Sequence, residues 1–150
     1  MEAAFAYLHF IAIIGVASCL VAELSVCTLD LQPPYVRALA RIDLLYLVCA
    51  VAALATGIVR LSLSPKGTAF YLHNPVLYIK LALFVAVGLA SIPPTLQFLR
   101  WHRAIKSGQE RILKDRDILS VRRYLALEVL LFACIPLAGV LMARGVGLQS

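Results

Sequence analysis

The sequence has little charge. Asp, Glu, Lys and Arg make up only 15% of its 150 residues, whereas they form about a quarter of an ordinary soluble domain. Hydrophobic residues reach 62% and the mean hydropathy is +0.90. This low proportion of charged residues excludes an ordinary soluble domain. The length of 150 residues suits a single domain. The sequence therefore predicts a single transmembrane domain over residues 1–150.

Paired cysteine motifs are also absent. The chain has four cysteines but no C-x-x-C and no zinc-like spacing, which argues against a zinc site and against a disulfide framework. All four lie in or near apolar stretches, where a free cysteine acts as a small hydrophobic residue. We therefore expect packing roles for Cys19, Cys27, Cys49 and Cys134.

Long hydrophobic runs are what the chain does have. A transmembrane helix needs about 20 predominantly apolar residues, and four stretches qualify. The first follows Met1 and Glu2, which carry no positive charge, so we expect a retained helix and not a cleaved signal peptide. The fold class predicted is all-α, an integral membrane four-helix bundle. Its helices are expected over about residues 3–29, 37–61, 75–100 and 122–144.

Lysine and arginine are distributed unevenly between the two sides. Arg37 and Arg41 precede the second run, and residues 100–123 carry eight more. The opposite side has only Arg60, Lys66 and Arg144. Because basic residues stay on the cytoplasmic side, we predict a cytoplasmic loop at 101–121 and both termini outside. The net charge of +6 then indicates contact with anionic membrane lipids, and no nucleic acid.

Prolines are expected to shape the helices. Pro33 and Pro34 should end the first hairpin, because proline cannot continue a helix. Pro93 and Pro94 lie inside the third run and Pro136 inside the fourth. We expect both of these helices to bend there.

Charged groups inside the runs indicate where function lies, since each costs about 2.5–3.5 kcal/mol on insertion scales. One layer is expected near the cytoplasmic face: Glu23, Asp30, Arg37, Arg41, Asp43, Arg100 and Glu128. Two interpretations stay open. The acids can pair with the arginines and fasten the helix ends together, or the same residues can transfer protons.

A second polar layer is expected near the outer face, formed by His9, Arg60, His73 and Lys80. A lone histidine can be a packing residue, and Lys80 can simply extend to the head groups. A neutral histidine nitrogen is also a metal ligand when the other nitrogen is hydrogen-bonded. With Lys80 and Arg60 to neutralise carboxylates, His9 would suit a large apolar ligand such as heme. His9 and Glu23 are 14 residues apart, which places both on one helix face within roughly 40°.

Several short motifs carry a resemblance to a known family. They are Leu8-His9-Phe10, Arg41-Ile42, Gly57, Asn74-Pro75-Val76-Leu77-Tyr78-Ile79-Lys80-Leu81, Leu99-Arg100-Trp101-His102-Arg103 and Leu127-Glu128-Val129. Over nearly its full length the chain resembles HemJ-type protoporphyrinogen oxidases. It is also similar to small bacterial predicted membrane protein families with the same four-helix plan, and more distantly to copper-resistance membrane proteins.

The HemJ resemblance implies a heme b-binding oxidoreductase of the bacterial inner membrane. It implies His9 as the iron ligand, with Lys80, Arg41 and Glu128 as matching polar positions. From their position beside His9, we expect Lys80 and Arg60 to neutralise the heme propionates. Arg41 and Glu128 are then the candidate catalytic residues, which position a substrate or relay protons; a porphyrin or a quinone is the expected substrate. The chain departs from the family at residues 27–30, which replace a His-x-Glu cluster.

A function without a cofactor is the alternative. Buried charges also suit a small transporter or a non-catalytic membrane assembly subunit. Small residues at Ala82, Ala86 and Gly88 allow close helix approach within one chain or in a homo-oligomer.

The predicted orientation can be tested with reporter fusions. Alkaline phosphatase, which folds only outside the cytoplasm, should be active when fused after Ser150 and inactive when fused after Ser107. Green fluorescent protein should give the opposite pattern. Phosphatase activity at Ser107 would reverse the topology.

Overall fold

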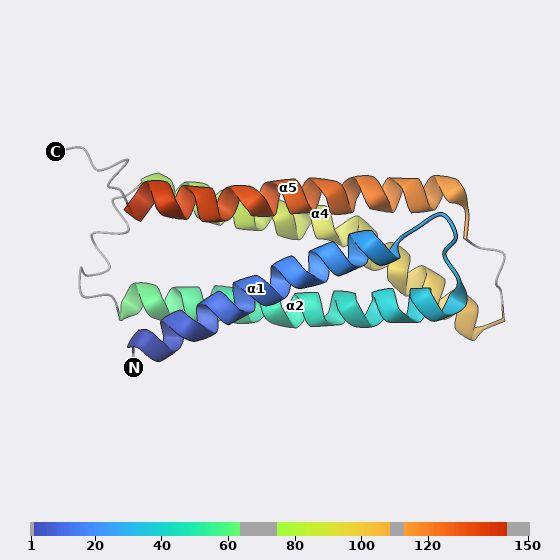
Figure 1. Ribbon diagram of the computed structural model, residues 1–150, viewed down its shortest axis with the longest axis horizontal. Coiled ribbons are helices and arrows are strands. Elements are labelled where there is room, and N and C mark those ends of the chain that lie inside the picture. Colours follow the sequence, from blue (N-terminus) through green and yellow to red (C-terminus); the bar gives the residue numbers. More distant parts are fainter. Residues whose placement is uncertain (1, 64–74, 109–112, 144–150) are drawn as a thin grey trace.

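The regular structure of this protein is helical throughout its described part. The computed structural model describes residues 2–63, 75–108 and 113–143. These ranges contain four helices, α1 (Glu2–Val26), α2 (Pro33–Ser62), α4 (Pro75–Lys106) and α5 (Asp115–Ala143) (Figure 1). Each is long and apolar enough to cross a membrane. The predicted all-α fold with four membrane-spanning helices is confirmed.

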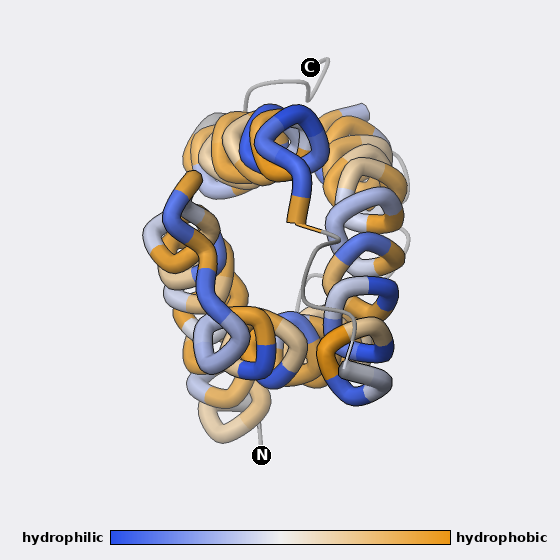
Figure 2. Tube along the Cα trace, turned by 90° about the vertical axis from the view of Figure 1, so that its right-hand side faces the viewer, coloured by the Kyte–Doolittle hydropathy of each residue, from blue (hydrophilic) through white to orange (hydrophobic). Residues whose placement is uncertain are grey.

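The helices form two antiparallel hairpins. α1 packs mainly on α2, and α4 packs mainly on α5, while the hairpins meet through α2 with α4 and α1 with α5. Figure 2, viewed along the bundle, shows the four helices surrounding one axis. The start of α1 and the end of α5 lie at one end of the bundle, and the α1–α2 connection lies at the other. We call these the open end and the loop end.

The buried core is thickest toward the loop end. There Phe98 and Trp101 of α4 are fully buried and their ring centroids lie 6.0 Å apart. A second cluster nearer the middle joins Val16 and Leu20 to Tyr46. Large apolar side chains on the outer faces of all four helices are exposed. Such an apolar exterior suits lipid contact.

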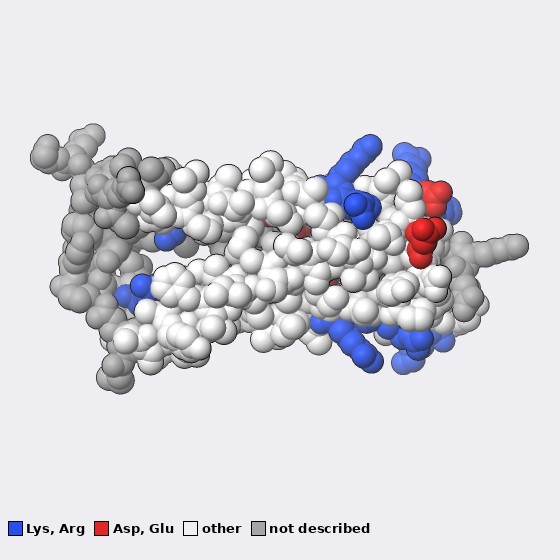
Figure 3. All heavy atoms as spheres, in the orientation of Figure 1, with Lys and Arg blue, Asp and Glu red and all other residues white. Residues whose placement is uncertain are grey.

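Basic side chains gather at the loop end (Figure 3). Among the described residues, only Arg60 and Lys80 belong to the opposite half of the bundle. The predicted asymmetry of charge is therefore present in three dimensions. Which side of a membrane the loop end faces stays a prediction.

The first hairpin differs from its predicted boundaries. α2 begins at Pro33 and not near residue 37, because proline is well tolerated in the first helical turn, where its missing N–H costs no hydrogen bond. α1 ends at Val26, three residues early. Carbonyls at this helix end are bound from another helix: Nη1 of Arg122 donates to Leu24 O at 3.3 Å and to O of Cys27, the residue after α1. A cation at a helix C-terminus is favourable.

The predicted basic loop at 101–121 is mostly helical. α4 continues to Lys106, and Gly108 follows it with a φ of 77°, the left-handed conformation that commonly ends a helix. α5 starts at Asp115, seven residues before the predicted start, with Asp115 and Asp117 in its first turn. Hydropathy locates the apolar span, whereas these polar turns extend the helices beyond it. Asn74, Lys66 and His73 lie outside the described residues.

The paired prolines coincide with a change in direction of α4. Pro93 and Pro94 lie in its interior, and Figure 1 shows α4 leaving the side of α5 near its middle and crossing toward the start of α2. Proline removes backbone hydrogen bonds and bends a helix. α5 also contains a proline, the exposed Pro136, yet Figure 1 shows this helix running without a visible bend.

Close contact between α1 and α2 depends on Gly15. A Cβ at Gly15 would lie 2.7 Å from the Cys49 sulfur, whereas a Cβ at Gly88 would meet nothing within 4 Å. We predict that Gly15→Val destabilises the fold by about 1–3 kcal/mol through overpacking. The matched Gly88→Val should change stability by no more than about 0.5 kcal/mol.

Thermal unfolding in detergent, followed by circular dichroism, measures the difference. Cys49→Ala should partly restore the melting temperature of Gly15→Val, because it removes the clashing sulfur. Equal melting temperatures for the two glycine variants would show that Gly15 does not set the helix spacing.

Candidate functional site

His9 of α1 is held by the backbone of α2. Its Nδ1 lies 2.9 Å from Ala53 O and 3.0 Å from Thr56 Oγ1. A carbonyl oxygen can only accept, so Nδ1 must carry the proton in this arrangement. The Thr56 hydroxyl donates to Ala52 O at 2.6 Å, which leaves its lone pairs to accept from His9. The other ring nitrogen, Nε2, therefore carries a free lone pair.

Gly57 makes room for the imidazole. A Cβ at this position would lie 3.2 Å from His9 Cε1, closer than most carbon contacts allow. Two hydrogen-bond acceptors and the backbone surface at Gly57 therefore fix the position of the imidazole ring. In the described ranges no hydrogen bond to Nε2 occurs. The Nδ1 position is thus fixed by hydrogen bonds, and Nε2 is the ring nitrogen left to accept a further contact.

Two cations share the open end with His9. The Arg60 guanidinium carbon lies 5.7 Å from the centroid of the Phe10 ring. Arg60 and Lys80 both lie close enough to His9 to act on it electrostatically, and Arg60 also acts on Lys80. Lys80 Nζ is 3.5 Å from where a Cβ on Gly139 would stand. The predicted cofactor-binding residues therefore come together, although they belong to three helices.

The described donors at the open end are too few for a bare metal ion. Across the described residues, no group of three or more His, Cys, Asp or Glu side chains could hold one. His9 can thus supply one ligand, and a metal bound there would have to bring most of its ligands with it.

A second polar centre lies about 21 Å along α1, the rise of 14 helical residues. Glu23, Asp43 and Glu128 are 2%, 9% and 1% exposed, and their carboxyl groups act on one another electrostatically. The predicted inward-facing stripe of α1 is confirmed, since Val16 and Leu20 are buried between His9 and Glu23.

The expected ion pairs at this centre are not formed. No arginine acts on the three carboxyl groups within the described chain. Asp43 accepts from Thr95 Oγ1 at 2.7 Å, while one oxygen each of Glu23 and Glu128 has no hydrogen-bond partner among the described residues. The reason is orientation, because the carboxyl groups face the bundle interior whereas Arg37 and Arg41 are exposed.

The two candidate catalytic residues are therefore in different environments. Glu128 is buried in the middle of α5, and Arg41 is exposed on α2. The sequence interpretation missed Tyr46, whose hydroxyl lies near the Glu128 carboxyl. The sequence did contain a signal for Tyr46. It lies three residues after Asp43, and residues i and i+3 share a helix face.

The four cysteines are free thiols. Cys19 and Cys27 are buried in the two core clusters. Burial raises the pKa of the Cys27 thiol to about 11, so it stays protonated at neutral pH. This behaviour suits a packing role.

A family model described as predicted membrane protein (DUF2214) matches residues 1–147. The chain belongs to this family. No curated protein matches the chain, and no solved structure does so. Membership in this family agrees with the four apolar helices, and its description states no activity. Function must therefore be inferred from the two polar centres.

The unpaired carboxyl groups give a testable pH dependence. As pH rises, ionised Glu23, Asp43 and Glu128 would repel one another with no cation to offset the repulsion, so the folded state should lose stability. Glu23→Gln and Glu128→Gln should each raise the melting temperature, and more at about pH 9 than at about pH 6.

Melting curves of the purified protein at both pH values supply the measurement. Asp30→Asn, at an exposed acid on the α1–α2 connection, is the matched control and should have little effect. A drop in melting temperature for both glutamine variants at high pH would mean that an unseen cation pairs with these groups.

Proposed function

We propose that this protein is a heme b-binding redox protein of the membrane, with His9 Nε2 as an axial ligand of the iron. The observation that supports this most strongly is the pair of acceptors at His9 Nδ1, Ala53 O and Thr56 Oγ1. Metal-ligating histidines commonly donate their other N–H to a carbonyl, which selects the tautomer and orients the ring.

The surroundings of His9 fit a heme better than a bare ion. A porphyrin brings four nitrogen ligands of its own, so one histidine suffices on this side. Heme also carries two propionates, and Arg60 and Lys80 are the cations beside His9. Their positive charges would neutralise the propionates inside a poorly solvated bundle, where an unpaired charge is costly.

When bound, heme supplies one-electron redox chemistry, tuned by its axial ligand and by the polarity around it. The residues of the chain would do the rest. His9 ligates and orients, Arg60 and Lys80 bind carboxylates, and Glu128 can hold a proton in the bundle interior. Protoporphyrinogen oxidation in the bacterial inner membrane, the activity of the HemJ-type proteins that the motifs resemble, belongs to this proposal.

Arg41 has a different place in the proposed function. It is exposed near the loop end, so it suits contact with an anionic lipid or with the carboxylate of an approaching substrate better than direct chemistry at Glu128.

The competing function is a small transporter without a cofactor. The observation in its favour is the set of buried carboxyl groups, of which Glu23 and Glu128 each have an oxygen without a hydrogen-bond partner in the described structure. Intramembrane acids commonly mark ion or proton pathways. The two functions differ in what His9 does, since only the heme protein needs its Nε2.

An absorption spectrum tests the proposal. The detergent-purified protein, produced with heme supplementation, should show a Soret band that shifts on reduction with dithionite. His9→Ala should remove the band or reduce its intensity at least about tenfold, because the iron loses its protein ligand.

His102→Ala is the matched control. This histidine lies on α4 toward the loop end, and its loss should leave the spectrum unchanged. A wild-type protein without a Soret band, or a His9→Ala spectrum identical to wild type, would refute heme ligation by His9 and favour the transporter.

A further inference from the structure

Two of the four cysteines meet across the contact between α1 and α2. Cys19 lies on α1 and Cys49 on α2, and a side-chain hydrogen bond joins the two thiols. Cys19 is buried, whereas Cys49 is half-buried at the edge of the same core cluster. Both are free thiols. The fold therefore brings two reduced sulfur atoms together from two different helices.

The two backbones come close together beside this pair. A Cβ on Gly15, one helical turn before Cys19, would lie 3.4 Å from Cys49 Cβ and 2.7 Å from its sulfur. For comparison, the Cβ atoms of a disulfide lie about 3.5–4.5 Å apart. Residues i and i+4 share a helix face, so Cys49 packs over the strip of α1 that contains Gly15 and Cys19. A bond between the thiols therefore needs side-chain rotation and only a small movement of the helices.

The other two cysteines lie in different surroundings. Cys27 is fully buried in the separate cluster at the loop end. Cys134 Sγ on α5 donates to Leu130 O of its own helix at 3.4 Å. Within the described ranges, neither thiol is hydrogen-bonded to a second thiol. They are built-in controls for any chemistry that requires two adjacent sulfur atoms.

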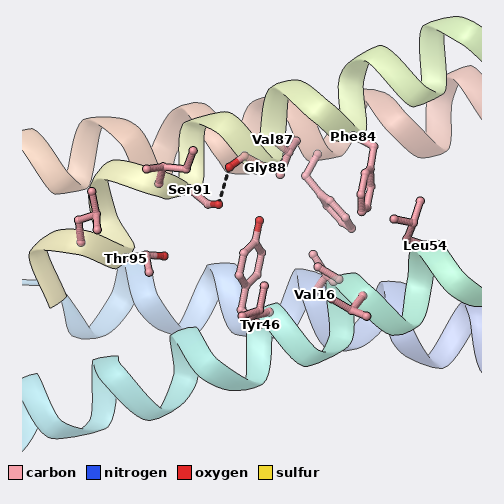
Figure 4. A pocket seen from close by; sticks show the side chains of 14 residues that line it. Val16, Tyr46, Leu54, Phe84, Val87, Gly88, Ser91 and Thr95 are labelled. Carbon is pink, nitrogen blue, oxygen red and sulfur yellow. Dashed lines mark hydrogen bonds between the residues drawn. The ribbon is translucent and has the colours of Figure 1, made fainter. Parts of the chain in front are cut away.

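The surroundings of the thiol pair decide which oxidant can reach it. Val16, Leu20 and Tyr46 form the buried cluster around the pair. Val16 and Tyr46 also line a mostly apolar pocket of about 370 Å³ between α2 and α4 (Figure 4). A water-soluble oxidant partitions poorly into such a region, within helices long and apolar enough to cross a membrane. A lipid-soluble oxidant can approach the half-buried Cys49 from the bilayer.

We propose that Cys19 and Cys49 are a modification site, at which a lipid-soluble organic hydroperoxide forms a reversible disulfide between α1 and α2. The Cys49 sulfur attacks the peroxide, the O–O bond breaks, and an alcohol leaves with the Cys49 proton, which gives a sulfenic acid. The Cys19 sulfur then displaces the hydroxyl group, which leaves as water with the Cys19 proton, and the S–S bond forms. The two thiols lose two electrons and the hydroperoxide gains them.

The position of the pair gives the bond a consequence for the whole bundle. At the open end, His9 of α1 is hydrogen-bonded to Ala53 of α2. Near the middle, Glu23 of α1 is acted on by Asp43 of α2. Cys19 lies between His9 and Glu23 on α1, and Cys49 lies between Asp43 and Ala53 on α2. Oxidation would therefore fasten the two helices together between the two polar centres, and a dithiol reductant would release them.

Thiol counting on the full-length protein in lipid nanodiscs tests the site. The probe is cumene hydroperoxide, and the free thiols are then counted with a polyethylene glycol maleimide after denaturation. The count should fall from four to two and return to four with dithiothreitol. Oxidised glutathione, a water-soluble oxidant, should leave all four thiols free.

Mass spectrometry identifies the bonded pair. Trypsin cuts between Cys19 and Cys49 at Arg37 and Arg41, so a disulfide joins two peptides that a reductant separates. Because Cys19 and Cys27 share one of these peptides, the digestion is repeated with Cys27→Ala, which should give the joined peptides as wild type does.

Two variants test the geometry. Cys19→Ala should keep all of its remaining thiols free at the same dose of hydroperoxide. The double variant Cys19→Ala/Ser18→Cys moves the thiol about 100° around α1, to an exposed position, and should form no bond with Cys49. Cys134→Ala, which removes a thiol outside the pair, should lose two of its three thiols and regain them with dithiothreitol.

The outcomes also separate this site from the proposed heme, on which it does not rest. His9→Ala should form the disulfide as wild type does, even if its Soret band is lost. Loss of the bond in His9→Ala would show that a bound heme reacts with the peroxide, and would overturn the proposal. Four free thiols after treatment, a single irreversibly oxidised cysteine, a bond to Cys27 or Cys134, or equal bonding from position 18 would each overturn it as well.

Discussion

Hydrogen bonding inside an apolar solvent is the constraint on which this structure depends. A bilayer offers no partner for a backbone amide, so the chain crosses it as helices whose N–H and C=O groups bind one another. The same solvent penalises polar side chains on the outer faces. The structure accordingly turns Glu23, Asp43 and Glu128 inward and presents leucine, isoleucine and valine outward. The polar side chains that could carry chemistry therefore lie in the bundle interior and at its two ends.

The interior contains two polar centres with different chemistry. At the open end, His9 is oriented by Ala53 and Thr56 beside two cations, an environment suited to an anionic ligand that carries a metal. Near the middle, Glu23 and Glu128 lie close to Tyr46 and Asp43 acts on both of them, with no cation acting on these acids in the described part of the chain, an environment suited to holding protons. The apolar pocket between α2 and α4 borders the second centre. Under the proposed function, heme at the open end would carry electrons and the acids near the middle would hold protons.

Side chains also complete the backbone hydrogen bonds that the helices cannot make alone. Arg122 of α5 binds carbonyls at the end of α1, across nearly a hundred residues of sequence. Thr56 uses one hydroxyl both to bind its own helix and to accept from His9. Polar residues of this kind serve packing and function together, so their substitution should affect both.

The sequence alone determined the all-α membrane fold, the number of spans and the inward stripe of α1, because apolar length and helical periodicity are local properties. It also led us to expect His9, Arg60 and Lys80 at one depth, from their similar positions along the apolar runs. It misplaced the start of α2, the extent of α4 and α5, and the partners of the buried acids. Only the tertiary structure decided that Arg37 and Arg41 face outward while Glu128 faces Tyr46, and that a pocket opens beside them. Those relations depend on how each helix is rotated against its neighbours, and the rotation is set by contacts such as Gly15 with Cys49, which join residues distant in the chain.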